Sequence, residues 1–547
     1  MRSPSTVLRR ASALFLALLA GPALAGPATA GPATTRPPAL GGGSATAGDV
    51  RALDSVIPAP VQTAADPRAD YRLGPATLIR TQFGSAEARR VGEHLAGVLR
   101  PATGYPLPVV PAVSARPAGI TLLLGGADGR VGRGGYQLDV ARSGVTIRAT
   151  SGEGLFNGVQ TLRQLLPAAI ESPRPTRRSW TVPGGRIVDQ PRFGYRGAML
   201  DLARHFHTPA EIRTYIDLIS QYKVNHLHLH LSDDQGWRIQ IDSWPRLTTV
   251  GGGPGTGVDG VGAGYLTKAE YRALNAYAAA RYVTIVPEID MPGHTNAAQS
   301  TYAELNCDGV AVPPRTDIAV GYSSLCVEDE LTYTFVEDVI RELAAMTPGP
   351  YLHIGGDEAH ATTDEQYRTF MDRVIPMVAR YGKRAFGWHE IAKVSPPTSV
   401  VPQYWGTGST DASVAAAAAR GNKVLMSPAN RAYLDMKYDR STPLGLSWAG
   451  LIEVRDAYDW DPATRVPGVG EESILGVEAP LWSETLRSID DIEFMAFPRL
   501  PAIAELGWST PHSHDWESFR QRLAQQAPRW TAQEVNFYRS PQIPWVD

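Results

Sequence analysis

The chain has 547 residues, 43% of them apolar and 20% charged, which is typical of a globular protein with room for more than one domain. Its 52 basic and 55 acidic residues give a net charge of -3, so the charge balance does not favour nucleic acid or an anionic membrane as a partner. Beyond the N-terminus, no apolar run reaches the roughly 20 residues that span a bilayer.

Residues 1–25 have the pattern of a secretory signal peptide. Arginines precede an apolar core at residues 11–20, and Ala-Leu-Ala at residues 23–25 forms a small-x-small cleavage site. Residues 26–49 are rich in Gly, Pro, Ala and Thr, and such a composition predicts a flexible leader because it cannot bury a core. We therefore expect a secreted, extracellular protein.

Residues 50–185 are predicted to form a small α+β domain. Its expected strands lie at residues 76–80, 120–124, 136–140 and 145–149, the last two joined as a hairpin. Its expected helices lie at residues 86–99 and 154–166, and the first carries Val91, Leu95 and Leu99 on one face. No cluster of catalytic residue types occurs in this segment, so we interpret it as a structural module.

The pattern from residue 190 to residue 547 is an alternation of short apolar strands with helical segments. The expected strands lie at residues 195–201, 226–233, 283–290, 351–358, 384–390, 400–405, 424–428 and 474–484. Eight such units predict an α/β protein with a (β/α)8 TIM barrel as its catalytic domain, closed by C-terminal helices near residues 493–506 and 516–538. In that fold the active site lies at the C-terminal ends of the strands.

The stretch at residues 351–360 joins an apolar strand to Gly355, Gly356, Asp357 and Glu358. Two adjacent carboxylates repel each other, so one of them usually holds its proton, and a catalyst can use that difference. The alternative is an ordinary solvated helix start, where acidic residues are favourable. Because neighbours on a regular strand point to opposite faces, a shared pocket requires irregular backbone there, which the glycines permit.

The two cysteines of the chain are Cys307 and Cys326. In an exported protein a disulfide between them is the default expectation. Two buried free thiols are the alternative.

The motif His-x-Gly-Gly-Asp-Glu at residues 353–358 resembles the signature of glycoside hydrolase family 20, the β-N-acetylhexosaminidases. Further matches lie at residues 203–206, 231–235 and 287–294, and the resemblance covers about residues 50–540. It implies an exo-acting, retaining enzyme that hydrolyses terminal non-reducing β-linked N-acetylglucosamine, with N-acetylgalactosamine as a second candidate, from chitooligosaccharides or glycans. In this family the substrate's own acetamide attacks, through an oxazolinium intermediate. No metal or organic cofactor is implied.

The resemblance also implies five catalytic residues. Glu358 would be the general acid and later the base, and Asp357 would accept the acetamide N–H and stabilise the cationic intermediate. Tyr433 would donate its hydroxyl to the acetamide oxygen. Asp233 and His294 resemble the relay that orients the acid.

Seven further residues are implied to bind substrate: Arg204, Asp435 and Glu484 at sugar hydroxyls, Trp388, Trp405 and Trp482 around the acetamide methyl, and Trp448 at the next sugar. Any one of these tryptophans taken alone could be plain core, and each charged residue could be a surface ion pair. Asp201, Asp234 and Glu288 are interpreted as structural hydrogen-bond partners at the barrel rim.

Two rival functions follow from the same sequence. His226, His228 and His230 alternate along one expected strand and so face one side, as in the zinc sites of metal-dependent barrel hydrolases. That alternative leaves Glu358 and the tryptophans unexplained. A non-catalytic glycan-binding protein on an inactive barrel is the other rival, although every expected catalytic position is filled.

Overall fold

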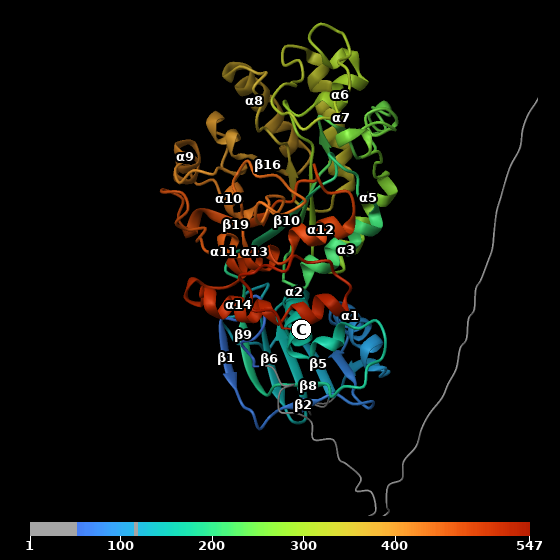
Figure 1. Ribbon diagram of the computed structural model, residues 1–547, viewed down its shortest axis with the longest axis vertical. Helices are drawn as coiled ribbons and strands as arrows, with labels where there is room; N and C mark the ends of the chain where they lie inside the picture. The colour runs from blue at the N-terminus through green and yellow to red at the C-terminus, as the bar shows by residue number, and fades with distance from the viewer. Residues whose placement is uncertain (1–51, 114–118, 547) are drawn as a thin grey trace, which may run out of the picture. The chain divides into compact units, whose positions relative to one another are not determined.

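The computed structural model describes residues 52–113 and 119–546, which form a small α+β domain followed by an eight-stranded barrel (Figure 1). The predicted signal peptide and leader lie outside the described residues. In the part of the chain that the structure describes, no helix is both long enough and apolar enough to cross a membrane.

The small domain contains a seven-stranded mixed sheet. Its spatial order is β1 (Gln62–Ala65), β9 (Gly185–Asp189), β6 (Tyr136–Ala141), β7 (Gly144–Ala149), β5 (Gly119–Leu124), β3 (Ile79–Gln82) and β4 (Val109–Ala112). Two short strands, β2 (Tyr71–Arg72) and β8 (Thr181–Val182), pair separately. The four predicted strands and their hairpin are observed, whereas β1, β4 and β9 were not predicted.

Helices α1 (Ala86–Thr103) and α2 (Gly152–Leu165) pack against this sheet. Helix α1 begins after Ser85, whose side chain accepts a hydrogen bond from a first-turn N–H, and ends at Gly104 with a φ of 66°. Its predicted apolar face is buried in the core of the small domain. Backbone carbonyls of α2 accept hydrogen bonds from Arg529 near the C-terminus, so α2 lies between the sheet and the C-terminal helices.

The second part of the chain is a closed barrel of eight parallel strands that follow one another in chain order. They are β10 (Tyr195–Asp201), β11 (His226–His230), β14 (Thr284–Glu288), β15 (Tyr351–His353), β16 (Arg384–Trp388), β17 (Val401–Tyr404), β18 (Val424–Met426) and β19 (Ile474–Ala479). Pairing of β19 with β10 closes the barrel. The predicted fold class is confirmed.

Helices connect the strands on the outside of the barrel. They are α3 (Pro209–Ser220), α4 (Arg246–Thr249), α5 (Lys268–Ala279), α6 (Asn296–Thr301), α7 (Glu330–Met346), α8 (Asp364–Arg380), α9 (Ala412–Arg420), α10 (Ala429–Ala432) and α11 (Val454–Tyr458). A short hairpin, β12 (Ser232–Asp233) with β13 (Gly236–Trp237), follows β11. Between β16 and β17 the connection is a 3-10 helix, His389–Val394, instead of an α-helix.

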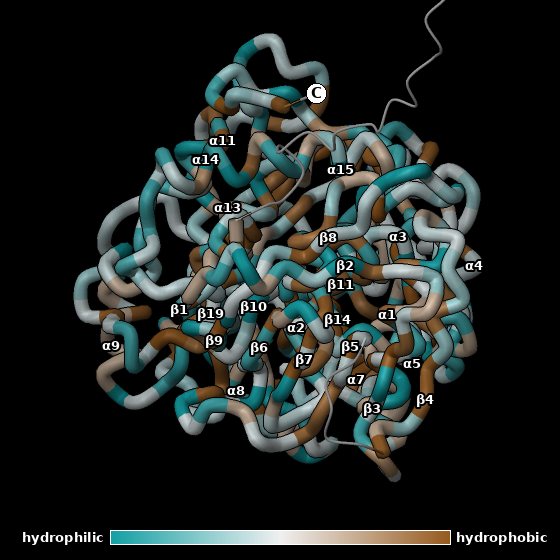
Figure 2. The backbone as a smooth tube through the Cα atoms, turned by 90° about the horizontal axis from the view of Figure 1, so that it is seen from below, coloured by the Kyte–Doolittle hydropathy of each residue, from teal (hydrophilic) through white to brown (hydrophobic). Residues whose placement is uncertain are grey.

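The chain closes with four helices where two were predicted. They are α12 (Ile489–Ala496), α13 (Arg499–Trp508), α14 (Trp516–Ala524) and α15 (Ala527–Ala532). The first break falls at Pro498, because a proline has no N–H to donate and disfavours helical geometry in the residue before it. In the hydropathy view, hydrophobic segments recur among the central strands and helices, while loops at the margin are mainly hydrophilic (Figure 2).

Candidate active site

The functional residues predicted from sequence follow the C-terminal ends of neighbouring barrel strands. Every barrel strand except β10 ends before its predicted limit, so most of these residues belong to the connections after the strands, whereas Trp388 is the last residue of β16. Arg204 follows β10, Asp233 follows β11 and His294 follows β14. Since the strands are parallel and ordered by sequence, these loops meet at one end of the barrel.

The backbone becomes irregular at the two adjacent carboxylates, as expected. Strand β15 ends at His353, and Gly355, Gly356 and Glu358 then take positive φ angles of 63°, 98° and 44°. A Cβ atom on Gly355 would lie 1.7 Å from Oδ1 of Asp290, so no larger residue fits without displacement. This departure from strand geometry lets Asp357 and Glu358 line the same cavity.

The cavity at this end of the barrel has a volume of about 450 Å³, within the range of small-ligand pockets. Nine predicted residues line it: Arg204, His294, Asp357, Glu358, Trp405, Tyr433, Trp448, Trp482 and Glu484. Ile318, Val320, Leu446 and Ser447 complete the lining and were not predicted. They are ordinary loop residues, and no sequence pattern marks them.

A larger cavity of about 720 Å³ lies at the opposite ends of the strands, where His226, Thr284 and Tyr351 begin β11, β14 and β15. Of the residues that line it, only Glu153 is acidic. Of these two cavities, only the smaller one is therefore lined by paired carboxyl groups.

Three residues form a chain of contacts that reaches Glu358. Nδ1 of His294 lies 3.1 Å from Oδ1 of Asp233, and Nε2 of His294 lies 3.4 Å from Oε2 of Glu358 and 3.7 Å from Oδ2 of Asp357. Asp233 is buried and does not line the cavity. The predicted pair of Asp233 and His294 is thus brought together behind the two adjacent carboxylates.

The charges of this group are set by burial and by each other. Burial alone would lower the pKa of His294, but the Asp233 and Asp357 carboxylates outweigh it and hold that pKa well above its ordinary value. Burial and the neighbouring Asp290 raise the pKa of Asp357 well above its ordinary range, against the effect of His294. The site therefore presents a cationic imidazole to two carboxyl groups.

The residues predicted to bind sugar hydroxyls gather around one guanidinium. Arg204 pairs with Asp233 at 2.8 Å and with Glu484 at 4.0 Å, and its guanidinium lies over the ring of Trp482. Asp435 is buried next to this group, and in the described residues no side chain donates a hydrogen bond to its carboxylate. Burial and the Glu484 charge raise the pKa of Asp435 well above its ordinary value.

The predicted tryptophans lie in two layers. Trp405 and Trp482 line the cavity, and Trp448, with 53% of its surface exposed, lies at the mouth. Trp388 is completely buried, does not line the cavity and lies 5.7 Å from Trp482 between ring centroids. Tyr433 lines the cavity and contacts Trp448 and Trp482.

The expected disulfide is present. Cys307 and Cys326 are bonded, and their Cα atoms lie 4.9 Å apart. The loop that the bond closes carries Ile318 and Val320, which line the cavity.

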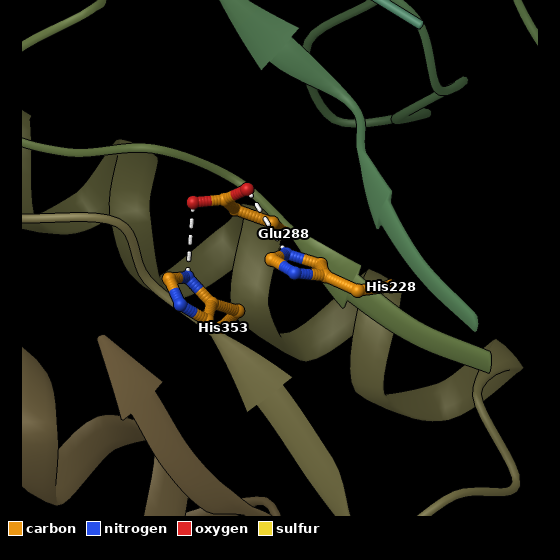
Figure 3. Close-up of side chains that lie close together, drawn as sticks. All are labelled: His228, Glu288 and His353. Carbon is orange, nitrogen blue, oxygen red and sulfur yellow. Dashed lines mark ion pairs between the residues drawn. The ribbon is translucent and has the colours of Figure 1, made fainter. Parts of the chain in front are cut away.

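The alternating histidines of β11 do not act as one set. His226 stacks on Tyr195 at the opposite end of the barrel, with ring centroids 3.9 Å apart. His228, Glu288 and His353 lie close enough to share a metal ion, and Figure 3 shows both imidazoles paired with the carboxylate between them. Burial opposes protonation of His228, but Glu478 and Glu288 raise its pKa to about 9, so a metal ion would have to displace a proton there.

A closed (β/α)8 barrel with adjacent carboxyl groups, a histidine relay and a tryptophan-lined cavity defines a glycoside hydrolase. The family model for the glycosyl hydrolase family 20 catalytic domain matches residues 193–511, and the model for domain 2 of that family matches residues 54–190. The chain belongs to glycosyl hydrolase family 20.

Known relatives agree with this assignment. A β-N-acetylhexosaminidase from Cellulomonas fimi is 41% identical over 497 residues, covering 90% of this chain and 97% of the relative. The solved β-N-acetylhexosaminidase of Streptomyces coelicolor A3(2) is 55% identical, with a TM-score of 0.88 over 91% of this chain and 100% of that chain. A mutant Streptomyces plicatus β-hexosaminidase solved with its product GlcNAc is 55% identical, with a TM-score of 0.87 over 91% and 99%.

Proposed function

We propose that the chain is a β-N-acetylhexosaminidase that removes terminal non-reducing β-linked N-acetylglucosamine from chitooligosaccharides or glycans, with N-acetylgalactosamine as a second candidate substrate. The observation that carries the proposal is that Asp357 and Glu358, adjacent in sequence, line one cavity with His294. Glycosidases that use a protein nucleophile place their two carboxylates on opposite sides of the sugar. Adjacent carboxylates instead suit an enzyme in which the substrate supplies the nucleophile.

The reaction then proceeds in two steps. The acetamide oxygen attacks the anomeric carbon, the bond to the leaving oxygen breaks, and Glu358 gives its proton to that oxygen. Asp357 accepts the acetamide N–H and stabilises the oxazolinium cation, whose charge favours the ionised carboxylate despite its raised pKa. Water then attacks the anomeric carbon while Glu358 takes its proton and the bond to the acetamide oxygen breaks, which restores the acetamide, and two inversions give net retention.

The side chains around the acetamide have matching roles in this proposal. Tyr433 donates its hydroxyl to the acetamide oxygen, and Trp405 and Trp482 enclose the methyl group. Holding the internal nucleophile in place can contribute on the order of 7 to 11 kcal/mol. Trp388 supports this wall from behind, because Trp482 lies between it and the cavity.

Exo action is supported by the gradient of exposure along the cavity. Arg204 is buried and the Glu484 side chain is 14% exposed, whereas Trp448 at the mouth is half exposed. A terminal sugar would place its hydroxyls on the buried charged groups, and the next sugar would stack on Trp448. Hydrogen bonds to charged groups are the stronger kind and suit this recognition.

Export is the second part of the proposal. The N-terminal pattern of residues 1–25 supports a secreted enzyme, and the disulfide between Cys307 and Cys326 is compatible with an oxidising compartment. Expression of the full chain should give a secreted product that begins after Ala25, as N-terminal sequencing would test. Retention of the uncleaved chain inside the cell would contradict it.

The test of the function compares aryl β-glycosides of N-acetylglucosamine, N-acetylgalactosamine and glucose. We expect cleavage of the N-acetylglucosaminide and at most trace cleavage of the glucoside, since glucose lacks the acetamide nucleophile. The rate on the N-acetylgalactosaminide decides whether that sugar is a second substrate. Near-equal cleavage of the glucoside would overturn the proposal. Binding of the aminosugars without hydrolysis would favour the glycan-binding alternative, and activity lost on exhaustive chelation would favour the metal-dependent one.

A further inference from the structure

Glu288, the last residue of β14, is completely buried beneath the cavity. Its carboxylate faces four ring nitrogens from three other strands. One oxygen lies 2.5 Å from Nδ1 of His230 and 3.0 Å from Nε2 of His228. The other lies 2.9 Å from Nδ1 of His353 and accepts a hydrogen bond of 2.9 Å from the Trp388 indole; Figure 3 shows His228 and His353 on either side of it.

The carboxylate is held as an anion by this arrangement. Burial alone would raise the pKa of Glu288, but His230, His353 and His228 outweigh it and hold the pKa well below its ordinary range. Burial likewise disfavours charge on His230, but Glu288 and Asp233 raise its pKa to about 10. A buried ion pair of this kind costs desolvation, so its geometry must be well satisfied.

One branch of contacts runs from Glu288 to the acid. His230 contacts Glu288 through Nδ1 and Oδ2 of Asp233 through Nε2, at 2.8 Å. The other oxygen of Asp233 faces His294, which in turn contacts Glu358. His230 and Arg204 both meet Oδ2 of Asp233, which leaves Oδ1 to His294 and to the backbone N–H of Asp234.

The second branch runs to the wall of the cavity. The Trp388 indole N–H is fixed by Glu288, and Trp388 packs against Trp482, which lines the cavity. His230 also meets the ring of Trp482 edge-on, with centroids 4.8 Å apart. Both branches therefore start at one carboxylate and end at the cavity.

We propose that Glu288 is a positioning residue that fixes the relay behind Glu358 and the tryptophan wall relative to each other. It touches neither the cavity nor the reacting atoms, and it acts through His230 on one side and Trp388 on the other. The inference rests on the proposed function, in which Glu358 protonates the leaving oxygen.

The test is Glu288→Gln, measured with two substrates that differ in leaving group. Cleavage of chitobiose needs protonation of a poor leaving group, whereas a dinitrophenyl β-glycoside of N-acetylglucosamine hardly needs it. Since general acid catalysis contributes about 10²- to 10⁴-fold, we expect kcat/KM to fall about tenfold more on chitobiose than on the activated substrate. A purely structural defect would lower both rates by the same factor.

Glu478→Gln is the matched control. Glu478 is also completely buried and contacts His228, Tyr195 and Gln403, but neither His230 nor Trp388. We expect it to reduce stability and to lower both rates by a similar factor, without selectivity for the leaving group. Thermal unfolding of both variants checks that each is folded at the assay temperature.

Two further variants separate the branches. His230→Gln should reproduce the leaving-group selectivity, and Trp388→Phe, which keeps a ring but loses the N–H, should lower both rates alike. If Glu288→Gln does not fold, the leaving-group selectivity of His230→Gln tests the inference in its place. Equal losses on both substrates for Glu288→Gln and for His230→Gln would overturn the inference.

Failure of the inference can be told apart from failure of the proposed function. If wild-type enzyme cleaves the glucoside as well as the aminosugar glycosides, the proposed function fails. If wild-type specificity is as expected but Glu288→Gln is not selective, only the positioning role of Glu288 fails.

Discussion

At the scale of single residues, two neighbouring carboxyl groups are given different environments. The Asp357 side chain is 11% exposed and has a raised pKa, whereas the Glu358 side chain is 28% exposed and lies at the cavity with His294 beside it. Different environments are how one site obtains an acid and a stabilising carboxylate from similar groups.

This difference predicts distinct behaviour for two amide variants. Glu358→Gln should abolish turnover of substrates with poor leaving groups, with a loss of roughly 10²- to 10⁴-fold, and recover part of the rate with a good leaving group. Asp357→Asn should lose rate with either leaving group, because the orientation of the acetamide is needed in both cases. Steady-state kinetics on an activated and an unactivated substrate measure the contrast. Wild-type rates for Asp357→Asn would rule out its role.

The sequence motifs predicted which residues gather at the cavity, but not the buried contacts that hold these residues in place. Asp233, His294 and Glu358 belong to recognisable sequence matches, and the structure brings them together. Glu288 was interpreted as a rim residue, although it is buried and joins two arms of the site. Its partners come from different strands, so only closure of the barrel reveals the arrangement.

At the scale of elements, β15, the strand that leads to the two adjacent carboxyl groups, is one of the shortest strands of the barrel. Strand β15 has three residues, and the glycines after it redirect the chain. Apolar runs predicted where each barrel strand begins, since the observed starts fall within one residue of the expected ones. The ends were predicted too late because polar residues continue the sequence pattern after the inter-strand hydrogen bonds have stopped.

Gly355→Ala tests the redirected segment. Its Cβ would collide with Asp290, and a left-handed φ costs an L-residue about 1 to 2 kcal/mol. We expect a loss of stability together with a fall in kcat, measured by thermal unfolding and kinetics. Gly382→Ala is the matched control, because Gly382 has a φ of 72° and open space around it. It should lose stability only, and an equal loss of activity in both variants would contradict the explanation.

The histidines of β11 predict a pH dependence of stability. The pKa values of His228 and His230 are raised from 6.5 to about 9 and about 10, chiefly because Glu478 and Glu288 outweigh the effect of burial. A raised folded-state pKa contributes stability fully below pH 6.5, and the contribution is lost as the pH rises through 9 to 10. The melting temperature should therefore fall as the pH rises from 6.5 to about 10.

His228→Gln should make that alkaline decline shallower. His226→Gln is the control on the same strand, since burial lowers the pKa of His226 to about 3 and it is neutral throughout the interval. Thermal unfolding across the pH range gives the melting temperatures of wild type, His228→Gln and His226→Gln. Parallel curves for wild type and His228→Gln would show that other groups cause the decline.

At the scale of the whole molecule, the small domain and the barrel share a buried charged cluster around Lys223 and Asp189. Lys223, after α3, lies 3.2 Å from Asp189, the last residue of β9, and both side chains are fully buried. The Asp189 carboxylate also accepts hydrogen bonds from Tyr136 and from the Trp508 indole, and the Lys223 ammonium lies 4.4 Å from the ring centroid of Trp508. The sequence gives no sign of this, because a lone lysine near a helix end is usually solvated.

This cluster predicts how strongly the two domains depend on each other. Lys223→Met would leave the Asp189 charge buried without its cation, and breaking a buried pair by removing one partner typically costs about 3 to 5 kcal/mol. Adding Asp189→Asn removes the stranded charge, so the double variant should recover much of that loss even though it lacks the ion pair altogether. Urea unfolding followed by the fluorescence of the chain's 12 tryptophans measures the free energy of unfolding.

Enzyme activity is the second measurement for the variants of Lys223 and Asp189. Lys223 lies outside the cavity, so all variants should keep wild-type kcat at temperatures where they remain folded. A loss below about 1 kcal/mol for Lys223→Met would mean that the charge is solvated or compensated elsewhere. A double variant less stable than Lys223→Met would mean that the hydrogen bonds of Asp189, of which the one from the Trp508 indole links the two domains, contribute more than its charge.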